Sequence, residues 1–328
     1  MKNTWKNVAG MATQQLAPIM KFAMRAISAC LLVSVCCCAS DVLYVADAKA
    51  QAIHVYPVGV NNPRPIKQIT QGIGYPGFLA TDAMGDLYVP DEIANTVTVF
   101  SIADFYDPDW KPSQVITDGV YSPRSVVVDA SNTLYVANGA NSTVTEYAFG
   151  ASQVTATISA PPVSWCNAGL GYYCLPLGMT TDSEALYVNW LVINHAIVNT
   201  LIYRYPLGST EGSDLDIGLL VSWSTALLDD GRLALSGAGF ARKGQPNAVG
   251  ILEYSLLDTA HYQRFPLKVF EQGIDFTQIA YNGKLLYGVH PLPGFVDILD
   301  DKGLLRGVVS QGISQASGIA IGRDDGTP

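Results

Sequence analysis

Four polar residues occupy the same position of a repeated sequence pattern, each four residues after a leucine: Asp47, Asp91, Asn138 and His290. Carboxylate and amide oxygens are the usual ligands of Ca²⁺ and Mg²⁺, and an added histidine would also permit Zn²⁺ or Mn²⁺. If the repeats bring these residues together, they predict a ring around one divalent ion. A second interpretation is that each Asp or Asn caps a tight turn, because these side chains hydrogen-bond the local backbone well. His290 stands where the regular copies have an acid or an amide, so the repeat alone does not explain it.

The repeat that would position these residues is built on the tripeptide Leu-Tyr-Val. Successive copies begin 44 to 53 residues apart, and the last two are degenerate: residues 43–45, 87–89, 134–136, 186–188, 233–235 and 286–288. A period of about 40 to 50 residues is typical of the four-stranded blade of a β-propeller. The spacing therefore predicts an array of similar β-units rather than a mixed α/β domain.

Other segments recur around the tripeptide. A short apolar run before it ends at Asp82, Asp129 or Asp182 in a turn, and an alternating β-branched segment such as 96–100 follows it. We expect these three aspartates to be structural. Residues 317–324 look like a first strand without a second, and residues 41–45 like a second strand without a first. Because joining them would remove an exposed sheet edge, we predict an all-β, six-bladed β-propeller over residues 40–328, with its first blade closed by strands from both termini.

The segments 123–147 and 74–100 resemble NHL repeats, with Pro-Arg-Ser-Val-Val-Val-Asp leading into Leu-Tyr-Val-Ala-Asn in the better copy. The resemblance covers residues 40–328 and is strongest in the first three blades. It implies a fold of the lactonase/NHL superfamily, which includes scaffolds, sugar-lactone hydrolases and lyases. The three-histidine zinc set of the propeller lyases and the acidic metal quartet of the lactonases do not map onto this chain. Fold alone does not fix function.

The N-terminal segment has the features of an export signal. Residues 26–39 are uncharged and largely apolar, and they follow Lys21 and Arg25. This run is shorter than the roughly 20 residues of a membrane-spanning helix, so residues 1–39, starting at Met1 or at Met20, predict a signal peptide. A lipid anchor and an uncleaved anchor are the alternatives. We therefore expect a protein that is secreted, periplasmic or attached to the cell envelope.

Two cysteines that follow this segment, Cys166 and Cys174, are eight residues apart and predict one disulfide that pins a loop, with two free thiols as the alternative. The same loop carries Trp165, Tyr172 and Tyr173. Exposed aromatic side chains bind sugar rings and peptides, although this loop could instead cover its own blade.

Three more residues are candidates for ligand binding. Trp190 and His195 bound an unusually apolar segment of the fourth repeat, and Arg124 precedes a first strand of the third. We expect Arg124 either to bind an anionic ligand or to pair with a neighbouring acid such as Asp91.

The net charge and the absence of known catalytic motifs argue against several classes of function. The chain has 28 acidic and 19 basic residues and a net charge of −9, which argues against nucleic acid and anionic membranes as partners. It contains no Gly-x-Ser-x-Gly elbow, phosphate loop or His-Glu-x-x-His motif. We therefore predict a module, without a resident cofactor, that binds a protein, a peptide or a glycan. The alternative is a metal-dependent hydrolase or lyase of the sugar-lactonase kind, with a divalent ion such as Ca²⁺ at the ring.

Overall fold

The computed structural model describes residues 40–215, 217, 221–238, 249–255, 268–269, 276–300 and 303–324. Most of these residues lie in strands, joined by turns and three short 3₁₀ helices: η1 (Ile102–Asp104), η2 (Ser164–Cys166) and η3 (Ala168–Leu170). No helix in these ranges is long and apolar enough to cross a membrane. The predicted signal peptide, residues 1–39, lies outside the described residues.

Within the described ranges the strands form six four-stranded antiparallel sheets. The inner strands, in order around the molecule, are β24 (Ala316–Asp324), β4 (Ala80–Thr81), β8 (Pro123–Val128), β12 (Tyr173–Thr181), β16 (Val221–Leu227) and β20 (Ile279–Tyr281). The second strands are β1 (Ser40–Asp47), β5 (Leu87–Asp91), β9 (Leu134–Asn138), β13 (Ala185–Asn194), β17 (Arg232–Ala238) and β21 (Leu285–His290).

The third and fourth strands complete each sheet toward the outside. The third strands are β2 (Ala52–Pro57), β6 (Thr96–Phe100), β10 (Thr143–Tyr147), β14 (Ala196–Pro206), β18 (Val249–Ser255) and β22 (Phe295–Asp300). The outer strands are β3 (Lys67–Ile69), β7 (Gln114–Ile116), β11 (Ala156–Ser159), β15 (Ser213–Asp214), β19 (Lys268–Val269) and β23 (Leu305–Val309).

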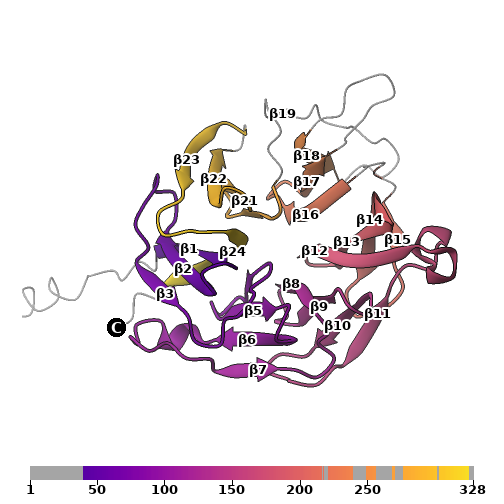
Figure 1. Ribbon diagram of the computed structural model, residues 1–328, viewed down its shortest axis with the longest axis horizontal. Coiled ribbons are helices and arrows are strands. Elements are labelled where there is room, and N and C mark those ends of the chain that lie inside the picture. The colour runs from indigo at the N-terminus through magenta and orange to yellow at the C-terminus, as the bar shows by residue number, and fades with distance from the viewer. Residues whose placement is uncertain are drawn as a thin grey trace, which may run out of the picture. The chain divides into compact units, whose positions relative to one another are not determined.

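The sheets follow one another around a common centre (Figure 1). Each inner strand contacts the inner strand of the next sheet, and β20 returns to β24. Six clusters of buried apolar side chains lie between neighbouring sheets, so each sheet packs on both of its faces. Burial of these faces is the main favourable contribution to the fold. The prediction of an all-β propeller is confirmed.

The first sheet combines strands from distant parts of the chain. β1 pairs antiparallel with β24, with Leu43 opposite Ile321 and Asp47 opposite Ala316. This is the pairing that the terminal segments predict. It covers the edge of β1 that would otherwise offer unpaired backbone groups to another chain.

The Leu-Tyr-Val copies lie in the second strands, where their leucines are buried. The tyrosine has a specific partner in three sheets. Tyr88 donates a hydrogen bond to Asp82 (3.2 Å), Tyr135 to Asp129 (3.3 Å) and Tyr187 to Asp182 (2.7 Å).

Each of these aspartates also caps the turn between its first and second strands. Asp129 Oδ1, for example, accepts the amides of Ser131 (2.8 Å) and Thr133 (2.9 Å). Burial, with the Asp182 hydrogen bond, raises the pKa of Tyr187 to about 12, so the phenol stays a donor at physiological pH. The three aspartates thus have the structural role that the sequence predicts.

Candidate functional site

The four residues of the predicted ring lie at the ends of the second strands β1, β5, β9 and β21. These ends belong to one face of the propeller, which carries the turns between second and third strands and the links that enter the next inner strand. We call it the loop face. The turns that hold Asp82, Asp129 and Asp182 lie at the other ends of the second strands, on the opposite face.

Asp91 is 2 % exposed, and both of its oxygens are occupied by backbone amides. Oδ1 accepts Ile93 N (3.1 Å) and Ala94 N (2.9 Å) of the β5–β6 turn. Oδ2 accepts Gly74 N (2.6 Å) and Tyr75 N (3.1 Å) of the incoming link. The carboxylate therefore ties a hairpin turn to the loop that enters the same sheet.

Asp47 has the same role in the first sheet, and Asn138 holds the incoming link of the third. Asp47 accepts Ala50 N (2.9 Å) from its own turn and Gln315 N (3.1 Å) from the link before β24. Asn138 accepts Tyr121 N (2.8 Å) and donates to Gly119 O (3.1 Å) of the link before β8. All three residues hold the link that enters their own sheet, and the two aspartates also cap their hairpin turns, in line with the turn-capping interpretation.

His290 is built differently. Its Nε2 lies 3.0 Å from Asp297 Oδ2, and its ring lies between Phe295 and Phe276, at centroid distances of 4.3 and 4.5 Å. The side chain is 6 % exposed. This imidazole is held by one carboxylate and two aromatic rings.

The described residues contain no group of three or more His, Cys, Asp or Glu side chains that could hold a metal ion. The lone pairs that Asp47 and Asp91 would offer to a cation accept backbone amides instead. The divalent-ion site stays a prediction, and the hydrogen-bond geometry of these residues does not favour it.

Arg124 pairs with an acid, but with a different one from the acid suggested by the sequence. Its guanidinium lies 2.8 Å from Glu92 Oε1, and the two side chains are 38 % and 28 % exposed. Asp91 is not the partner because backbone amides already occupy both of its oxygens. At this exposure the ion pair is worth little to stability.

The fourth sheet departs from the repeat because its strands are longer. β12, β13 and β14 have 9, 10 and 11 residues, whereas β9 and β10 of the third sheet have 5 each. The position four residues after Leu186 is therefore in the middle of β13 rather than at its end. Trp190 occupies it, is fully buried, and donates from Nε1 to the Tyr205 hydroxyl at 3.1 Å. The prediction that Trp190 contributes to a ligand surface is wrong.

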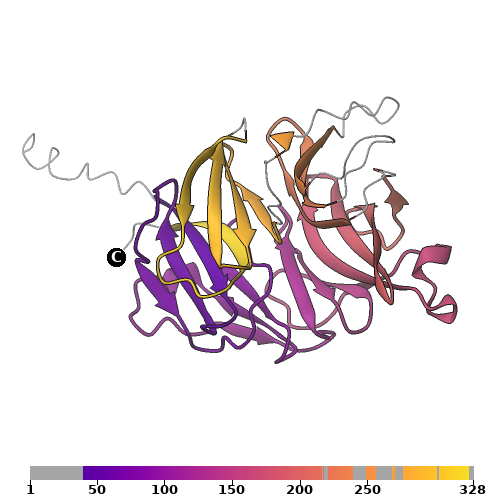
Figure 2. The ribbon, with the colours of Figure 1, turned by 45° about the horizontal axis from the view of Figure 1, so that its top comes forward.

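The loop before β12 carries the predicted disulfide. Cys166 and Cys174 are bonded, with their Cα atoms 5.1 Å apart. Trp165 and Tyr173 directly precede these cysteines and are 50 % and 55 % exposed. The disulfide therefore holds two half-exposed aromatic residues close together on the projecting part of the fourth sheet (Figure 2).

Two further candidate residues, Tyr172 and His195, lie in or near this disulfide-bonded loop. Tyr172 packs edge-on against Trp165, with ring centroids 5.5 Å apart. His195 is exposed at the β13–β14 turn, where it adopts a left-handed backbone conformation with φ of 56°. The structure thus brings three of the predicted aromatic residues together in one loop, and it leaves His195 accessible at the tip of the neighbouring hairpin.

The loop face carries further exposed apolar side chains that the repeat pattern does not predict. They lie in the turns between second and third strands and in the links between sheets: Tyr75, Ile93, Tyr121 and Leu292, exposed by 39, 74, 51 and 80 %. For Ile93 and Leu292 the sequence signal is an apolar residue in a hairpin turn, because turns normally carry polar residues. We call these four residues, together with Trp165, Leu170 and Tyr173, the apolar loop residues.

No protein-family model matches the sequence, and neither does any curated protein sequence. Solved structures do match. A chain in the crystal structure of a nidogen/laminin complex is similar, with a TM-score of 0.65, 15 % identity and coverage of 87 % of this chain and 99 % of that one. A chain of hydrazine synthase from Kuenenia stuttgartiensis gives a TM-score of 0.59 and 14 % identity, with 87 % of each chain covered. Identities this low establish the propeller fold and nothing finer.

Proposed function

We propose that this chain is a secreted, six-bladed β-propeller of the NHL type that binds a protein partner through its loop face. The observation that carries the proposal is the pair Trp165 and Tyr173, half-exposed and held by the adjacent disulfide on the projecting fourth sheet. Rigid aromatic side chains give large contact area at little entropic cost, and they dominate many protein interfaces. Peptides and glycans are the competing ligands.

A protein suits the loop face better than a sugar chain does. The apolar loop residues include the aliphatic Ile93, Leu170 and Leu292, which are 74, 61 and 80 % exposed. Sugars stack on aromatic rings, whereas exposed aliphatic groups gain most by burial against another apolar surface. The similar chain from a nidogen/laminin complex comes from an assembly of proteins, which fits the same kind of partner.

Three observations support the finer parts of the proposal. Six four-stranded sheets, each with its inner strand beside the next, support one blade for each sheet. In each of the two segments that resemble NHL repeats, a hydrogen bond joins the tyrosine of Leu-Tyr-Val to the aspartate of the preceding turn. The fourth sheet has the same bond. This shared contact supports the NHL type. The disulfide supports export, because such bonds persist in oxidising compartments.

Binding is tested with a photo-crosslinking residue at position 165 or 173, and at Met84 as the control. Met84 is also about half-exposed, at 55 %, but it lies in the β4–β5 turn on the opposite face. We expect one protein to crosslink from positions 165 and 173 and not from position 84. With that partner purified, Trp165→Ala and Tyr173→Ala should each weaken binding at least about tenfold, and Met84→Ala should not. Equal affinities for all three variants would refute the loop-face site.

Export has a separate test. N-terminal sequencing and intact mass of the protein recovered outside the cytosol should give a chain that begins near residue 40. A lipid-modified cysteine at position 36, 37 or 38 would establish the anchored alternative. An unprocessed chain retained in the cytosol would contradict export without bearing on the binding surface.

A further inference from the structure

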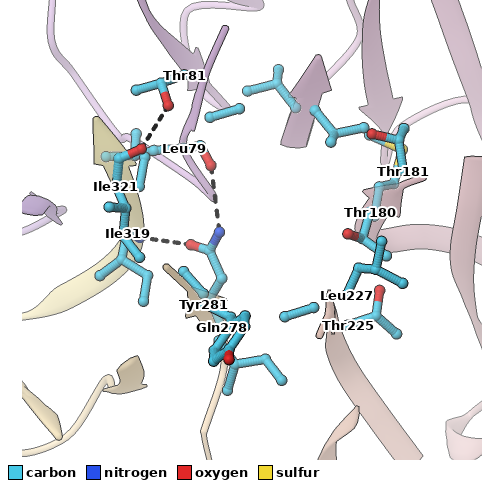
Figure 3. Close-up of a pocket in the computed structure, with 18 residues that line it drawn as sticks. Leu79, Thr81, Thr180, Thr181, Thr225, Leu227, Gln278, Tyr281, Ile319 and Ile321 are labelled. Carbon is cyan, nitrogen blue, oxygen red and sulfur yellow. Dashed lines mark hydrogen bonds between the residues drawn. The ribbon is translucent and has the colours of Figure 1, made fainter. Parts of the chain in front are cut away.

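The cavity of about 380 Å³ at the centre of the propeller is held by hydrogen bonds between neighbouring sheets. Thr81 donates to Ile321 O at 2.7 Å (Figure 3). The Gln278 amide accepts Ile319 N at 2.6 Å and donates to Leu79 O at 3.4 Å. The fold itself therefore uses these polar groups. Polar groups that the fold leaves without a partner, and that solvent reaches, are found on the loop face.

Two exposed tyrosines of the loop face have their backbone fixed by Asp91 and Asn138. Tyr75 N donates to Asp91 Oδ2 at 3.1 Å, and Tyr121 N donates to Asn138 Oδ1 at 2.8 Å. The two tyrosine side chains are 39 and 51 % exposed. Neither hydroxyl has a hydrogen-bond partner in the part of the chain that the structure describes. The fold thus holds two aromatic donors at fixed places and leaves them accessible.

A short chain of contacts joins the two tyrosines into one surface. Tyr75 O accepts the amide of Glu92 at 3.1 Å. Glu92 Oε1 in turn accepts the hydroxyl of Ser122 at 3.3 Å, and Ser122 directly follows Tyr121. Ile93, which follows Glu92 in the β5–β6 turn and is 74 % exposed, adds an aliphatic side chain. We call Tyr75, Ile93 and Tyr121 the tyrosine surface.

The protein itself already uses the acceptors around the tyrosine surface. Asp91 accepts four backbone amides, and Asn95 Oδ1 accepts Ser122 N at 2.6 Å. Glu92 Oε1 accepts Arg124 as well as Ser122. Arg124 is 38 % exposed, and Glu92 is its one acceptor among the described residues, so other N–H donors of its terminal nitrogens have no partner there. This part of the loop face therefore offers a ligand donors rather than acceptors.

Apolar rings combined with unused donors match a proline-rich peptide. Proline has no backbone N–H, so such a peptide presents carbonyl acceptors and apolar rings but few donors. Its polyproline II conformation has no internal hydrogen bonds, which leaves the carbonyls available, and it is formed before binding. A sugar chain fits less well, because its hydroxyls bring donors that need acceptors from the protein.

We propose that the tyrosine surface binds a proline-rich segment of the protein partner in the polyproline II conformation. The rings of Tyr75 and Tyr121 pack against the pyrrolidine rings of the segment. Their hydroxyls and the Arg124 guanidinium donate to its carbonyls. The segment belongs to the protein that binds the loop face, so its existence rests on the proposed function. Trp165 and Tyr173 contact another part of the same protein.

The test measures fluorescence polarisation with the purified protein and a labelled peptide of ten prolines as the probe. A labelled peptide of alternating Gly and Ser, which is flexible and rich in N–H groups, is the control ligand. We expect saturable binding of the proline peptide and none of the control ligand. Tyr75→Ala and Tyr121→Ala should each weaken binding about tenfold or more. Tyr121→Phe removes only the donor and should weaken it about 2- to 10-fold.

Tyr106→Ala is the matched control, because Tyr106 is 49 % exposed but lies just after η1, in the β6–β7 connection on the opposite face. This variant should bind the proline peptide as the unmodified protein does. Thermal unfolding shows whether each variant is folded.

The proline-rich segment is overturned if the proline peptide does not saturate the protein at its highest soluble concentration. It is equally overturned if the folded Tyr75→Ala/Tyr121→Ala double variant binds the peptide as tightly as the unmodified protein. Calorimetric binding of cellohexaose in place of the peptide would assign the surface to a glycan instead. Each of these results leaves crosslinking from positions 165 and 173 unaffected, so the proposed function is judged separately.

Discussion

The third and fourth sheets carry the same tripeptide in their second strands but use the residues after it differently. In the third sheet, β9 ends after five residues at Asn138, whose side chain holds the incoming link. In the fourth, β13 continues for ten residues, and the corresponding Trp190 is buried within the sheet. A repeat position therefore predicts a role only while strand length is kept. Where the strands lengthen, the cap disappears, and a disulfide-bonded loop carries the exposed aromatic residues.

The largest loss of stability should come from Trp190→Ala. This variant tests whether the position that holds a capping residue in the regular sheets is part of the hydrophobic core in the fourth. Removing this fully buried side chain should cost about 3 to 5 kcal/mol of unfolding free energy and lower Tm by roughly 10 °C. Trp165→Ala in the adjacent loop is the control and should cost under about 0.5 kcal/mol. Similar losses for the two variants would remove the distinction between core and surface.

Asp91→Ala tests the capping role of the corresponding residue in a regular sheet. It leaves four backbone amides without their acceptor, so we expect a loss of about 2 to 4 kcal/mol in urea unfolding. Asp91→Asn retains one acceptor oxygen and should lose less. If Asp91→Ala unfolds like the unmodified protein, the capping interpretation fails.

Replacing both loop cysteines by serine tests what the disulfide contributes to the fourth sheet. The bond closes a loop with a sequence separation of 8, for which the chain-entropy model gives about 2.5 kcal/mol. Chemical unfolding of Cys166→Ser/Cys174→Ser should show this loss. Adding a reductant to the unmodified protein should reproduce it and have no effect on the variant. A variant as stable as the oxidised protein would mean that the loop is ordered without the bond.

His54, which lies beside the capping residue Asp47 of the first sheet, should make a smaller and pH-dependent contribution to the free energy of unfolding. His54 Nε2 lies 3.6 Å from Asp47 Oδ2, and burial lowers the pKa of His54 below 6.5 although the Asp47 charge opposes the shift. The unfolded chain then binds the proton more readily, so this contribution to stability is complete above pH 6.5 and declines as the pH falls below it. Unfolding of His54→Gln across this range should decline less steeply than that of the unmodified protein. Parallel pH profiles would show that His54 does not titrate differently on folding.

The smallest expected effect is that of a chelator. If the polar residues at the strand ends are caps rather than metal ligands, EDTA should leave Tm unchanged, and elemental analysis should find no stoichiometric divalent ion. One ion per chain, lost together with several degrees of Tm, would instead favour the metal-dependent alternative.

The propeller could be predicted from the sequence because its signals are local and repeated. Each Leu-Tyr-Val copy marks a second strand, and the aspartates before it mark the turns. The two unpaired terminal segments also predicted the mixed first sheet. These inferences needed only alternation, spacing and the requirement that sheet edges be covered.

The site was less predictable because it depends on where strands end. Nothing in the fourth tripeptide shows that β13 extends further than β9, so the sequence does not predict that Trp190 is buried within the sheet. The sequence suggests Asp91 as the partner of Arg124, whereas the structure gives Glu92, because backbone amides occupy both Asp91 oxygens. The exposure of Ile93 and Leu292 follows from the positions of the turn tips, which the repeat gives only approximately.

The mixed first sheet has a consequence for the order of folding. Asp47 accepts an amide from a residue 268 positions away, so the inner edge of β1 cannot be covered until almost the whole described chain is available. Contacts this distant in sequence slow folding, because loop closure costs entropy before the contacts form. Until β24 arrives, β1 is an open strand edge that can pair with another molecule. A chaperone that shields this edge would therefore help most during the final step of folding.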